Sequence, residues 1–247
     1  GWTPTALIFP FFLFIVGVAM SFSFENRQSH GFSRLRLLGQ VVRRTLILFL
    51  LGLILAGFGD WRLIGPYILA IFGLALIFWD EPPLGLGHTG AERGRKLFGW
   101  AALVAAVLYF ALDFPYFQQP HPPAESPIRV PGVLQRIALC YFAASVVVLL
   151  AGVTGRVILT GLIVGGYWWI GTFVQPPESY AGDLPPERVL GRLHDWLDAT
   201  LLGRHLYRER PDPEGILSTL PAIATTLIGV LAGNWLRSYR EKRDHAL

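Results

Sequence analysis

Uncharged, mostly apolar runs follow one another along the chain, and the charged residues gather in the segments between them. The runs hold 15 to 24 residues, close to the roughly 20 that a helix needs to cross the hydrocarbon core of a bilayer. Flanking residues extend the shorter runs. The pattern therefore predicts an all-α, polytopic transmembrane bundle of about seven membrane-spanning helices. They cover residues 1–24, 45–59, 63–79, 97–112, 137–155, 157–177 and 215–236.

The longest connecting segment, residues 175–216, contains a second kind of pattern. In PPERVLGRLHDWLDATLLG the apolar residues are spaced three and four apart, as in an amphipathic helix, and Asp183 with two following prolines is typical of a helix start. The segment is predicted to form an interfacial helix that caps the bundle. The apolar positions are Val189, Leu190, Leu193, Trp196, Leu197 and Leu201.

The basic residues are concentrated in alternate connecting segments, and this sets the expected orientation. The positive-inside rule places residues 25–44, 80–96, 152–156 and 237–247 in the cytoplasm. Residue 1 and the loop 175–216 are then exofacial, and the C-terminus is cytoplasmic, in the cell (inner) membrane. The stretch RLRLLGQVVRR is predicted to run along the interface before the second helix enters the bilayer. The cytoplasmic set holds 13 of the 21 Lys and Arg residues: Arg27, Arg34, Arg36, Arg43, Arg44, Arg93, Arg95, Lys96, Arg156, Arg237, Arg240, Lys242 and Arg243.

Composition supports the membrane class and argues against a nucleic-acid partner. Charged residues make up 15% of the chain, whereas soluble domains are about a quarter charged. The cytoplasmic segments account for the net charge of +4, so no nucleic acid is expected to bind. Cys140, the single cysteine, lies in a membrane run, which predicts a buried thiol. The chain begins with Gly1 rather than methionine, so it is expected to be a piece of a longer protein.

The first candidate site is the polar mouth of a membrane run, in RVPGVLQRIALCYF. Pro131 suits the first turn of a helix, and Arg136 then lies roughly 8 Å further along its axis. A charge at a helix centre costs about 2.5–3.5 kcal/mol. Two interpretations remain open: a headgroup anchor, or an aqueous cavity with a fixed cation. The adjacent Gln135, and Gly132 one turn earlier, favour the cavity.

The second candidate site is the segment RHLYRERPDPEGIL, where His205 and Tyr207 precede Asp212 and Glu214. A histidine with a carboxylate partner is a general-base arrangement. The alternative is structural: Asp212 is a good N-cap with Pro213 as the first helical residue. A stripe of small residues that follows is suited to close helix packing, namely Ser218, Ala222, Thr225, Thr226, Gly229 and Gly233. No metal motif is present, and solvated positions are expected for His30, His88, His121, His194 and His245.

Three motifs together resemble the heparan-α-glucosaminide N-acetyltransferase family and its bacterial homologues. They are RVPGVLQRIALCYF, HLY followed by DPEGIL, and GWTPTALIFPFFLFIVG, and the match covers about 1–58 and 128–237. The resemblance implies a transmembrane acetyltransferase that moves an acetyl group from cytosolic acetyl-CoA to the amine of an amino sugar on the exofacial side. The expected partners are the lipid bilayer, acetyl-CoA as co-substrate and an amino-sugar-containing glycan, with no metal; a homodimer is a further expectation.

The resemblance and the spacing together assign the site. Arg129, Gln135 and Arg136 are expected to line the exofacial half of a tunnel through the bundle. The full set is His205, Asp212 and Glu214 as catalytic residues, and Arg129, Gln135, Arg136 and Tyr207 as substrate- or cofactor-binding residues.

The sequence also departs from the family pattern. The family's catalytic histidine and a partner asparagine lie just upstream of the GWTP segment, and members usually carry Asp at the position of Ala6. Residues 60–127 are expected to be an inserted helix pair within a single membrane-embedded domain, 1–247. The family's further C-terminal helices are absent as well, and the chain alone is expected to be inactive. Two alternatives stay open: a transporter or solute-binding protein without catalysis, or a catalytically dead parent.

Overall fold

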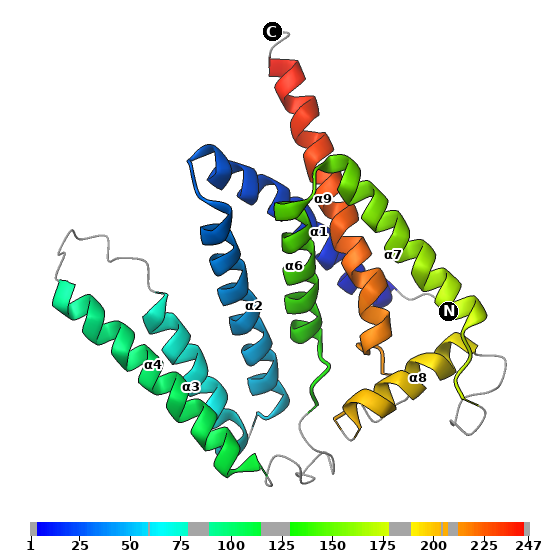
Figure 1. The fold of residues 1–247 in the computed structure, drawn as a ribbon. Helices are drawn as coiled ribbons and strands as arrows, with labels where there is room; N and C mark the ends of the chain where they lie inside the picture. The colour runs from blue at the N-terminus through cyan, green and yellow to red at the C-terminus, as the bar shows by residue number, and fades with distance from the viewer. Residues whose placement is uncertain are drawn as a thin grey trace.

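A computed structural model describes residues 4–58, 60–78, 89–114, 129–177, 189–203, 205–206 and 212–244. Every regular element within these residues is a helix, which confirms the predicted all-α class (Figure 1). The helices are α1 (Pro4–Ser29), α2 (Arg34–Ala56), α3 (Trp61–Ile77), α4 (Thr89–Leu112), α6 (Val133–Leu150), α7 (Val153–Phe173), α8 (Val189–Leu202) and α9 (Ile216–Asp244).

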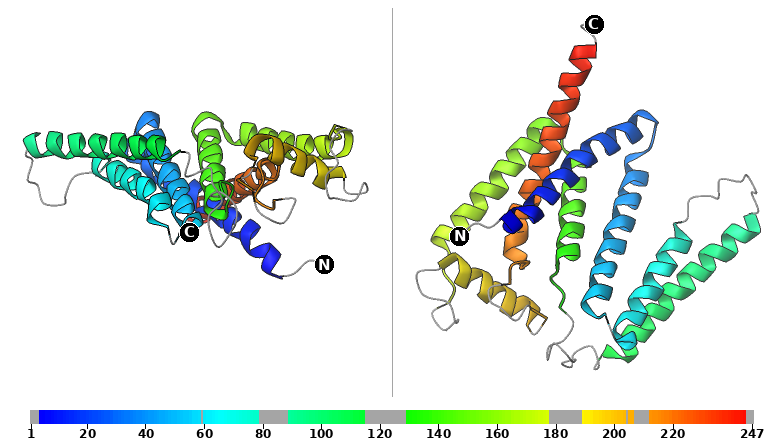
Figure 2. Two further views of the ribbon diagram at one scale, coloured as in Figure 1. Left: turned by 90° about the horizontal axis from the view of Figure 1, so that it is seen from below. Right: turned by 180° about the vertical axis from the view of Figure 1, so that it is seen from behind.

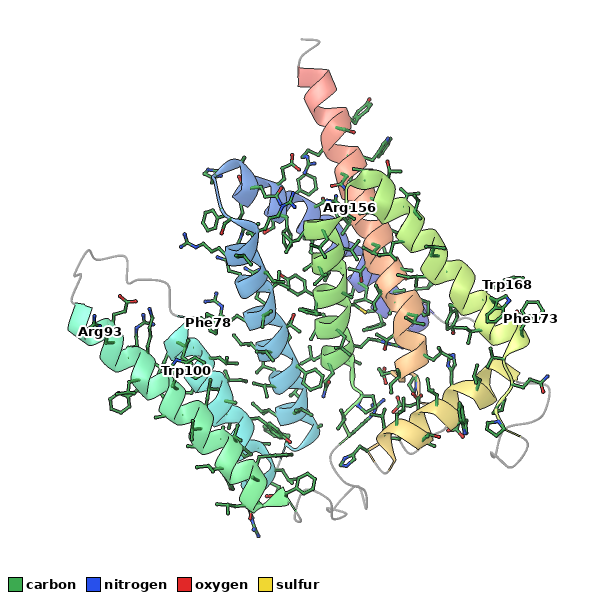
Figure 3. The ribbon with its side chains drawn as sticks, viewed as in Figure 1. Phe78, Arg93, Trp100, Arg156, Trp168 and Phe173 are labelled. Atoms are coloured by element: carbon green, nitrogen blue, oxygen red, sulfur yellow. The ribbon has the colours of Figure 1, made fainter. Side chains whose placement is uncertain are left out.

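Six of the described helices are long and apolar enough to cross a membrane. Their apolar portions are Leu7–Ser29, Arg34–Ala56, Glu92–Leu112, Val133–Leu150, Val153–Phe173 and Ile216–Tyr239. The remaining predicted span falls on α3, which has 17 residues and is at the lower limit for crossing a bilayer. The apolar side chains that face outward on α7 include Trp168 and Phe173, near the end that meets α8 (Figure 3). Aromatic residues at this level are typical of a membrane–water interface.

The first two helices are longer than the uncharged runs that predicted them. α1 continues to Ser29, and α2 begins at Arg34 after a short turn. The prediction that RLRLLGQVVRR runs along the interface is therefore wrong, because this stretch is the continuous start of α2. Leu37 and Val41 bury one face of the helix, while its arginines occupy the other positions. A helix can continue past the end of an uncharged run when its charged residues lie on one face and its apolar residues on the other. The uncharged runs therefore underestimated the lengths of these helices.

The centre of the bundle is a close crossing of α1 and α9. A Cβ added to Gly17 would lie 2.0 Å from the Thr226 carbonyl oxygen, and one added to Gly229 would lie 2.1 Å from the Phe14 carbonyl oxygen. The two backbones are therefore in direct contact, as the stripe of small residues on α9 predicted. The core around this crossing is formed by α1, α2, α6 and α9 together: Met20, Phe24, Leu37, Val41, Ala144, Val148, Leu149, Leu227 and Val230.

Helices α3 and α4 form a pair at the side of the bundle (Figure 1). Gly73 and Gly99 allow the pair to pack closely, since a Cβ on Gly73 would lie 2.7 Å from the Gly99 carbonyl oxygen. The pair packs against the remaining helices through α3 and α2. It coincides with the predicted inserted pair 60–127, whose origin as an insertion stays a prediction.

The two ends of the bundle differ in what they carry. The α1–α2 turn, the α6–α7 turn and the C-terminal part of α9 lie at one end, and α8 lies across the other end beside the starts of α6 and α9 (Figure 1, Figure 2). Arg156, at the first of these ends, donates from Nε to the carbonyl oxygen of Ala151 (3.0 Å) and from Nη2 to that of Val148 (2.9 Å) (Figure 3). We call the two ends the basic end and the α8 end.

Candidate functional site

An ion-pair cluster joins the segments that enter α6 and α9 at the α8 end. Arg129 Nη2 lies 2.6 Å from Asp212 Oδ1, and the same guanidinium also pairs with Glu214. The side chain of Asp212 is 1% exposed and that of Arg129 is 27% exposed. Burial alone would lower the pKa of the Arg129 guanidinium, but the hydrogen bonds and charges of Asp212 and Glu214 raise it above its usual value. The structure therefore brings together three of the predicted site residues, although Asp212 and Glu214 follow Arg129 in the sequence by 83 and 85 residues.

Asp212 stabilises the turn before α9 but does not cap the helix itself. Its Oδ1 accepts from the Glu214 backbone N–H (2.9 Å), and its carbonyl oxygen accepts from the Gly215 N–H (3.1 Å). The helix begins only at Ile216. The prediction that Asp212 is the N-cap and Pro213 the first helical residue is therefore wrong, because Pro213 and Glu214 form a turn.

The side chain that caps α9 is Asp198, which comes from α8. Its Oδ1 accepts from the Ile216 backbone N–H at 2.8 Å, while its Oδ2 is buried and has no hydrogen-bond partner among the described residues. The contact requires glycine at 215, since a Cβ there would lie 1.9 Å from Oδ2. Burial raises the pKa of the Asp198 carboxyl, and the charges of Asp212 and Asp195 add to this, against a lowering by the Ile216 N–H and Arg136.

His205 lies next to Arg129 through backbone contacts. The Val130 N–H donates to the His205 carbonyl oxygen at 3.1 Å, and the His205 N–H donates to the Leu202 carbonyl oxygen at 3.1 Å. These bonds fix the segment after α8 against the segment before α6, so His205 is at the same end of the bundle as the ion pairs. Its role as a base stays a prediction. Tyr207, the other residue expected from this motif, lies outside the described residues.

Arg136 is buried between three helices. On α6 it is 8% exposed, its Nη2 donates to Ser218 Oγ on α9, and its guanidinium lies over the Phe9 ring of α1 with 5.5 Å between Cζ and the ring centroid. Its Nε has no hydrogen-bond partner among the described residues. The headgroup interpretation is therefore excluded, because this guanidinium is enclosed by protein.

Gln135 occupies a different interface from Arg136. Neighbouring helical residues point about 100° apart. Gln135 is 3% exposed and fills the space left by two glycines, since a Cβ on Gly52 of α2 would lie 2.3 Å from its Oε1 and one on Gly132 would lie 2.5 Å from it. The expectation that Gly132 leaves an open face for a ligand is wrong in this conformation, because the Gln135 amide occupies that face.

His194 on α8 was missed by the sequence analysis, which expected it to be solvated. Its Nε2 lies 3.3 Å from the Tyr167 hydroxyl of α7, and the two ring centroids are 5.9 Å apart. Burial lowers the pKa of the His194 imidazole, and the charge of Arg136 lowers it further, so the neutral form is favoured. A neutral imidazole can accept a proton, which makes His194 a second candidate base.

The buried acids of α8 were missed because the helix was read only for its apolar face. Asp195 and Asp198 are both 1% exposed, and Leu193 is 3% exposed. The two acids are three residues apart and therefore share one side of the helix. This spacing of three residues was the feature of the sequence that could have predicted an acidic side on α8. The predicted Cys140 thiol is buried as expected.

Taken together, the fold and this cluster define a polytopic helical membrane protein with ionisable groups buried at one end of its bundle. The comparisons with known proteins agree with the family resemblance. The chain is 25% identical to human (Homo sapiens) heparan-α-glucosaminide N-acetyltransferase over 289 aligned positions, which cover 100% of this chain and 35% of the relative. It is 24% identical to the mouse (Mus musculus) protein of the same name, over 98% of this chain and 34% of that relative. No family model matches the chain.

These similarities support the family relationship that the three motifs predicted. The alignments extend over nearly the whole chain rather than the motifs alone. The chain spans about a third of the length of the curated relatives it matches.

Proposed function

We propose that this chain is part of a membrane acetyltransferase that moves an acetyl group from cytosolic acetyl-CoA to the amine of an amino sugar on the exofacial side. The proposal includes the orientation in which the basic end faces the cytoplasm. The resemblance of 24–25% to heparan-α-glucosaminide N-acetyltransferases supports the reaction class. The distribution of arginines supports the orientation.

The observation that carries the proposal is the buried, ionisable cluster at the α8 end of an apolar bundle. Charged groups inside a membrane bundle are costly, and they commonly mark the path or site of a substrate. Here Arg136 is enclosed by α1, α6 and α9, and the pair of Arg129 with Asp212 lies just outside it. A lipid anchor would need none of these buried contacts.

The chemistry requires a base, a place for negative charge and exclusion of water. The amine nitrogen attacks the thioester carbonyl carbon, the new N–C bond forms, and the C–S bond breaks. The amine proton goes to a base and then to the departing thiolate, so that the products are an amide and a free thiol. General-base catalysis of this kind contributes about 10²–10⁴-fold.

The described residues support a division of roles. The resemblance places the base that accepts the amine proton upstream of residue 1, and His205, with His194 as the second candidate, would be the substitute base within this chain. Arg136 would donate to the oxygen of the reacting carbonyl or of the sugar, because its Nε is buried without a hydrogen-bond partner among the described residues. Arg129 would hold Asp212 and Glu214 in place, and those carboxylates would attract the amine in its cationic form.

The test is an acetyl-transfer assay with labelled acetyl-CoA and glucosamine. It compares the 247-residue chain with the longest form of the protein that its gene encodes, both purified in neutral detergent. We expect turnover only with the longer form, because the resemblance puts the family's histidine upstream of residue 1. Turnover by the 247-residue chain that is lost in His205→Ala would instead make His205 the base.

The role of Arg136 is tested by Arg136→Lys in the active form. Lysine keeps the charge and loses the planar fork, so kcat/KM should fall by about tenfold or more, in line with the loss of one hydrogen bond to a charged group. Arg93→Lys, an exposed substitution on α4, is the matched control and should have no effect (Figure 3). Unchanged kcat/KM in Arg136→Lys would end its assignment to the site. Binding of glucosamine without transfer by the longest form would favour the solute-binding alternative.

A further inference from the structure

The first turn of α9 lies between helix α8 and the buried guanidinium of Arg136. Helix α8 lies across the start of α9 at the α8 end of the bundle (Figure 1). Asp198 of α8 accepts from the Ile216 backbone N–H at 2.8 Å, and Ser218 accepts from Arg136 Nη2. One turn of helix therefore contacts α8 at its first residue and the guanidinium of α6 at its third.

Gly215, directly before this turn, connects the two contacts. A Cβ at Gly215 would lie 1.9 Å from Asp198 Oδ2, so the backbone there touches the carboxyl group. The Gly215 carbonyl oxygen accepts from Ser218 Oγ at 2.9 Å and from Thr219 Oγ1 at 3.0 Å. Because the Ser218 hydroxyl donates its hydrogen to this carbonyl, its oxygen is the acceptor for Arg136. The position of Asp198 therefore sets the position of the hydroxyl that Arg136 meets.

The next part of α9 is held by α1 rather than by α8. A Cβ added to Gly17 of α1 would lie 2.0 Å from the Thr226 carbonyl oxygen, so the two backbones are in contact there. Pro221 lies between the two parts of α9. It has no N–H to donate to the carbonyl oxygen of Leu217, four residues earlier, and helices commonly bend at such a position. Residues 216–220 are therefore a short segment that is only weakly joined to the rest of α9.

We propose that Asp198 is a positioning residue for Arg136 and acts through residues 216–220. With α8 in place, the Asp198 cap keeps Ser218 against Arg136. When α8 moves away, the turn swings about Pro221 and the guanidinium loses its partner. A ligand that displaces α8 would change the surroundings of Arg136 in the same step, and by linkage a ligand held by Arg136 would retain α8. The inference rests on these contacts and does not depend on acetyl transfer.

The experiment uses the whole chain in neutral detergent, without an acyl donor or an amine. Its arginines are labelled at Nε with the heavy nitrogen isotope, and the Arg136 signal is the one that disappears in Arg136→Lys. Because Arg136 is 8% exposed, its Nε–H should exchange slowly with water while the helices around it stay closed. NMR measures this exchange. Deuterium exchange with mass spectrometry measures the backbone amides of α9 on either side of Pro221.

The variants separate a positioning role from an ordinary cap. Asp198→Ala and Asp198→Asn both remove the charge, but only asparagine keeps an oxygen that can accept from the first N–H of α9. Ser218→Ala removes the partner of Arg136 directly and shows the size of the full effect. The matched control is Thr200→Ala, an exposed substitution on α8 whose hydroxyl donates to the Trp196 carbonyl oxygen of the same helix at 2.7 Å.

We expect Asp198→Ala to exchange faster than Asp198→Asn by roughly five- to tenfold, as for the loss of a helix cap. This difference should appear both in the amides of residues 216–220 and in the Arg136 Nε–H. Ser218→Ala should accelerate the Arg136 signal by the same order. Asp198→Asn should exchange no faster than the unchanged chain, and Thr200→Ala should match it.

Two further variants test the turn itself. Gly215→Ala places a methyl group against the Asp198 carboxyl and pushes α8 away from α9 without removing the cap residue, so it should also accelerate the Arg136 signal. This variant keeps the proposal testable if Asp198→Ala does not fold. Adding Pro221→Ala to Asp198→Ala should slow the exchange again, because alanine supplies the N–H that joins the turn to the rest of α9.

The amides beyond Pro221 should exchange equally in all single variants on α8, because α1 holds that part of the helix. If Asp198→Ala accelerates the amides of the turn but not the Arg136 Nε–H, then Asp198 is an ordinary cap and the proposal is wrong. Equal acceleration on both sides of Pro221 would also overturn it, since that result indicates general destabilisation. Neither outcome would bear on the proposed acetyl transfer, which is measured separately.

Discussion

Removing the cation from the Arg129 cluster should destabilise the protein far more than breaking a surface ion pair. The substitution Arg129→Gln leaves Asp212, whose side chain is 1% exposed, and Glu214, which is 16% exposed, without the cation that neutralises them. Breaking a buried ion pair by removing one partner costs about 3–5 kcal/mol. Because Arg129 itself is 27% exposed, we expect the lower part of that range, about 3 kcal/mol.

The assay is thermal unfolding in detergent, followed by size-exclusion fluorescence. For a chain of this size about 1 kcal/mol shifts the melting temperature by 2–4 °C, so Arg129→Gln should lower it by roughly 6–12 °C. The matched control is Arg62→Gln, which breaks the pair of Arg62 and Asp113 with side chains 55% and 23% exposed. An exposed pair contributes about 0–1 kcal/mol, so the control should shift the melting temperature by a few degrees at most.

A double variant separates the loss of neutralisation from a loss of packing. Asp212→Asn removes the buried charge but keeps an oxygen that can accept from the Glu214 N–H. Adding it to Arg129→Gln should therefore recover most of the lost stability. The reasoning is wrong if Arg129→Gln shifts the melting temperature no more than Arg62→Gln, or if the double variant is less stable than Arg129→Gln alone.

Three further predictions concern packing, pH dependence and orientation. Gly229→Leu should prevent folding or lower the melting temperature strongly, because a side chain there meets the α1 backbone, whereas Gly161→Leu, which has open space, should not; thermal unfolding in detergent measures both. Asp198→Asn should stabilise the protein at neutral pH, because the raised pKa of the Asp198 carboxyl means that its ionised form disfavours folding. That gain should shrink as the pH falls through the raised pKa, and an unchanged gain at low pH would contradict it. In a cysteine-free background, Cys at Thr200 should react with an impermeant thiol reagent in intact cells, and Cys at Ser33 only after permeabilisation; the opposite pattern would reverse the proposed orientation.

The helices were predictable because each satisfies a local rule. Long uncharged runs have to be buried in lipid or protein, and the small-residue stripe of α9 indicated a close crossing before any partner was known. That partner is α1, whose Gly17 lies against Thr226 and Gly229. The amphipathic period of α8 was equally visible, and the helix Val189–Leu202 confirms it.

The polar contacts could not be predicted because they join residues far apart in the chain. Asp212 was a convincing local cap for α9, yet Asp198 of α8 caps that helix across the packed interface. Gln135 and Arg136 were expected to face one tunnel, but their 100° separation on α6 directs them to different neighbours. Only the arrangement of helices decides which neighbour each side chain meets.

The two ends of the bundle have opposite electrostatic character, and this constrains which ligand each end can accept. At the α8 end the described carboxylates Asp195, Asp198, Asp212 and Glu214 outnumber the cations Arg129 and Arg136, so an ammonium group is favoured there over an anion. At the basic end Arg27, Arg36 and Arg43 contact the Gln40 amide oxygen, the Phe32 ring and the Phe78 carbonyl oxygen rather than a described carboxylate, so an anion is favoured there. Gln40, which accepts from Arg27 at the basic end, and Gly52, which packs against Gln135 near the other end, are roughly 18 Å apart along α2 at 1.5 Å per residue. A single ligand that reached both ends would therefore have to be extended over about this distance, with its anionic group at the basic end and its cationic group at the α8 end.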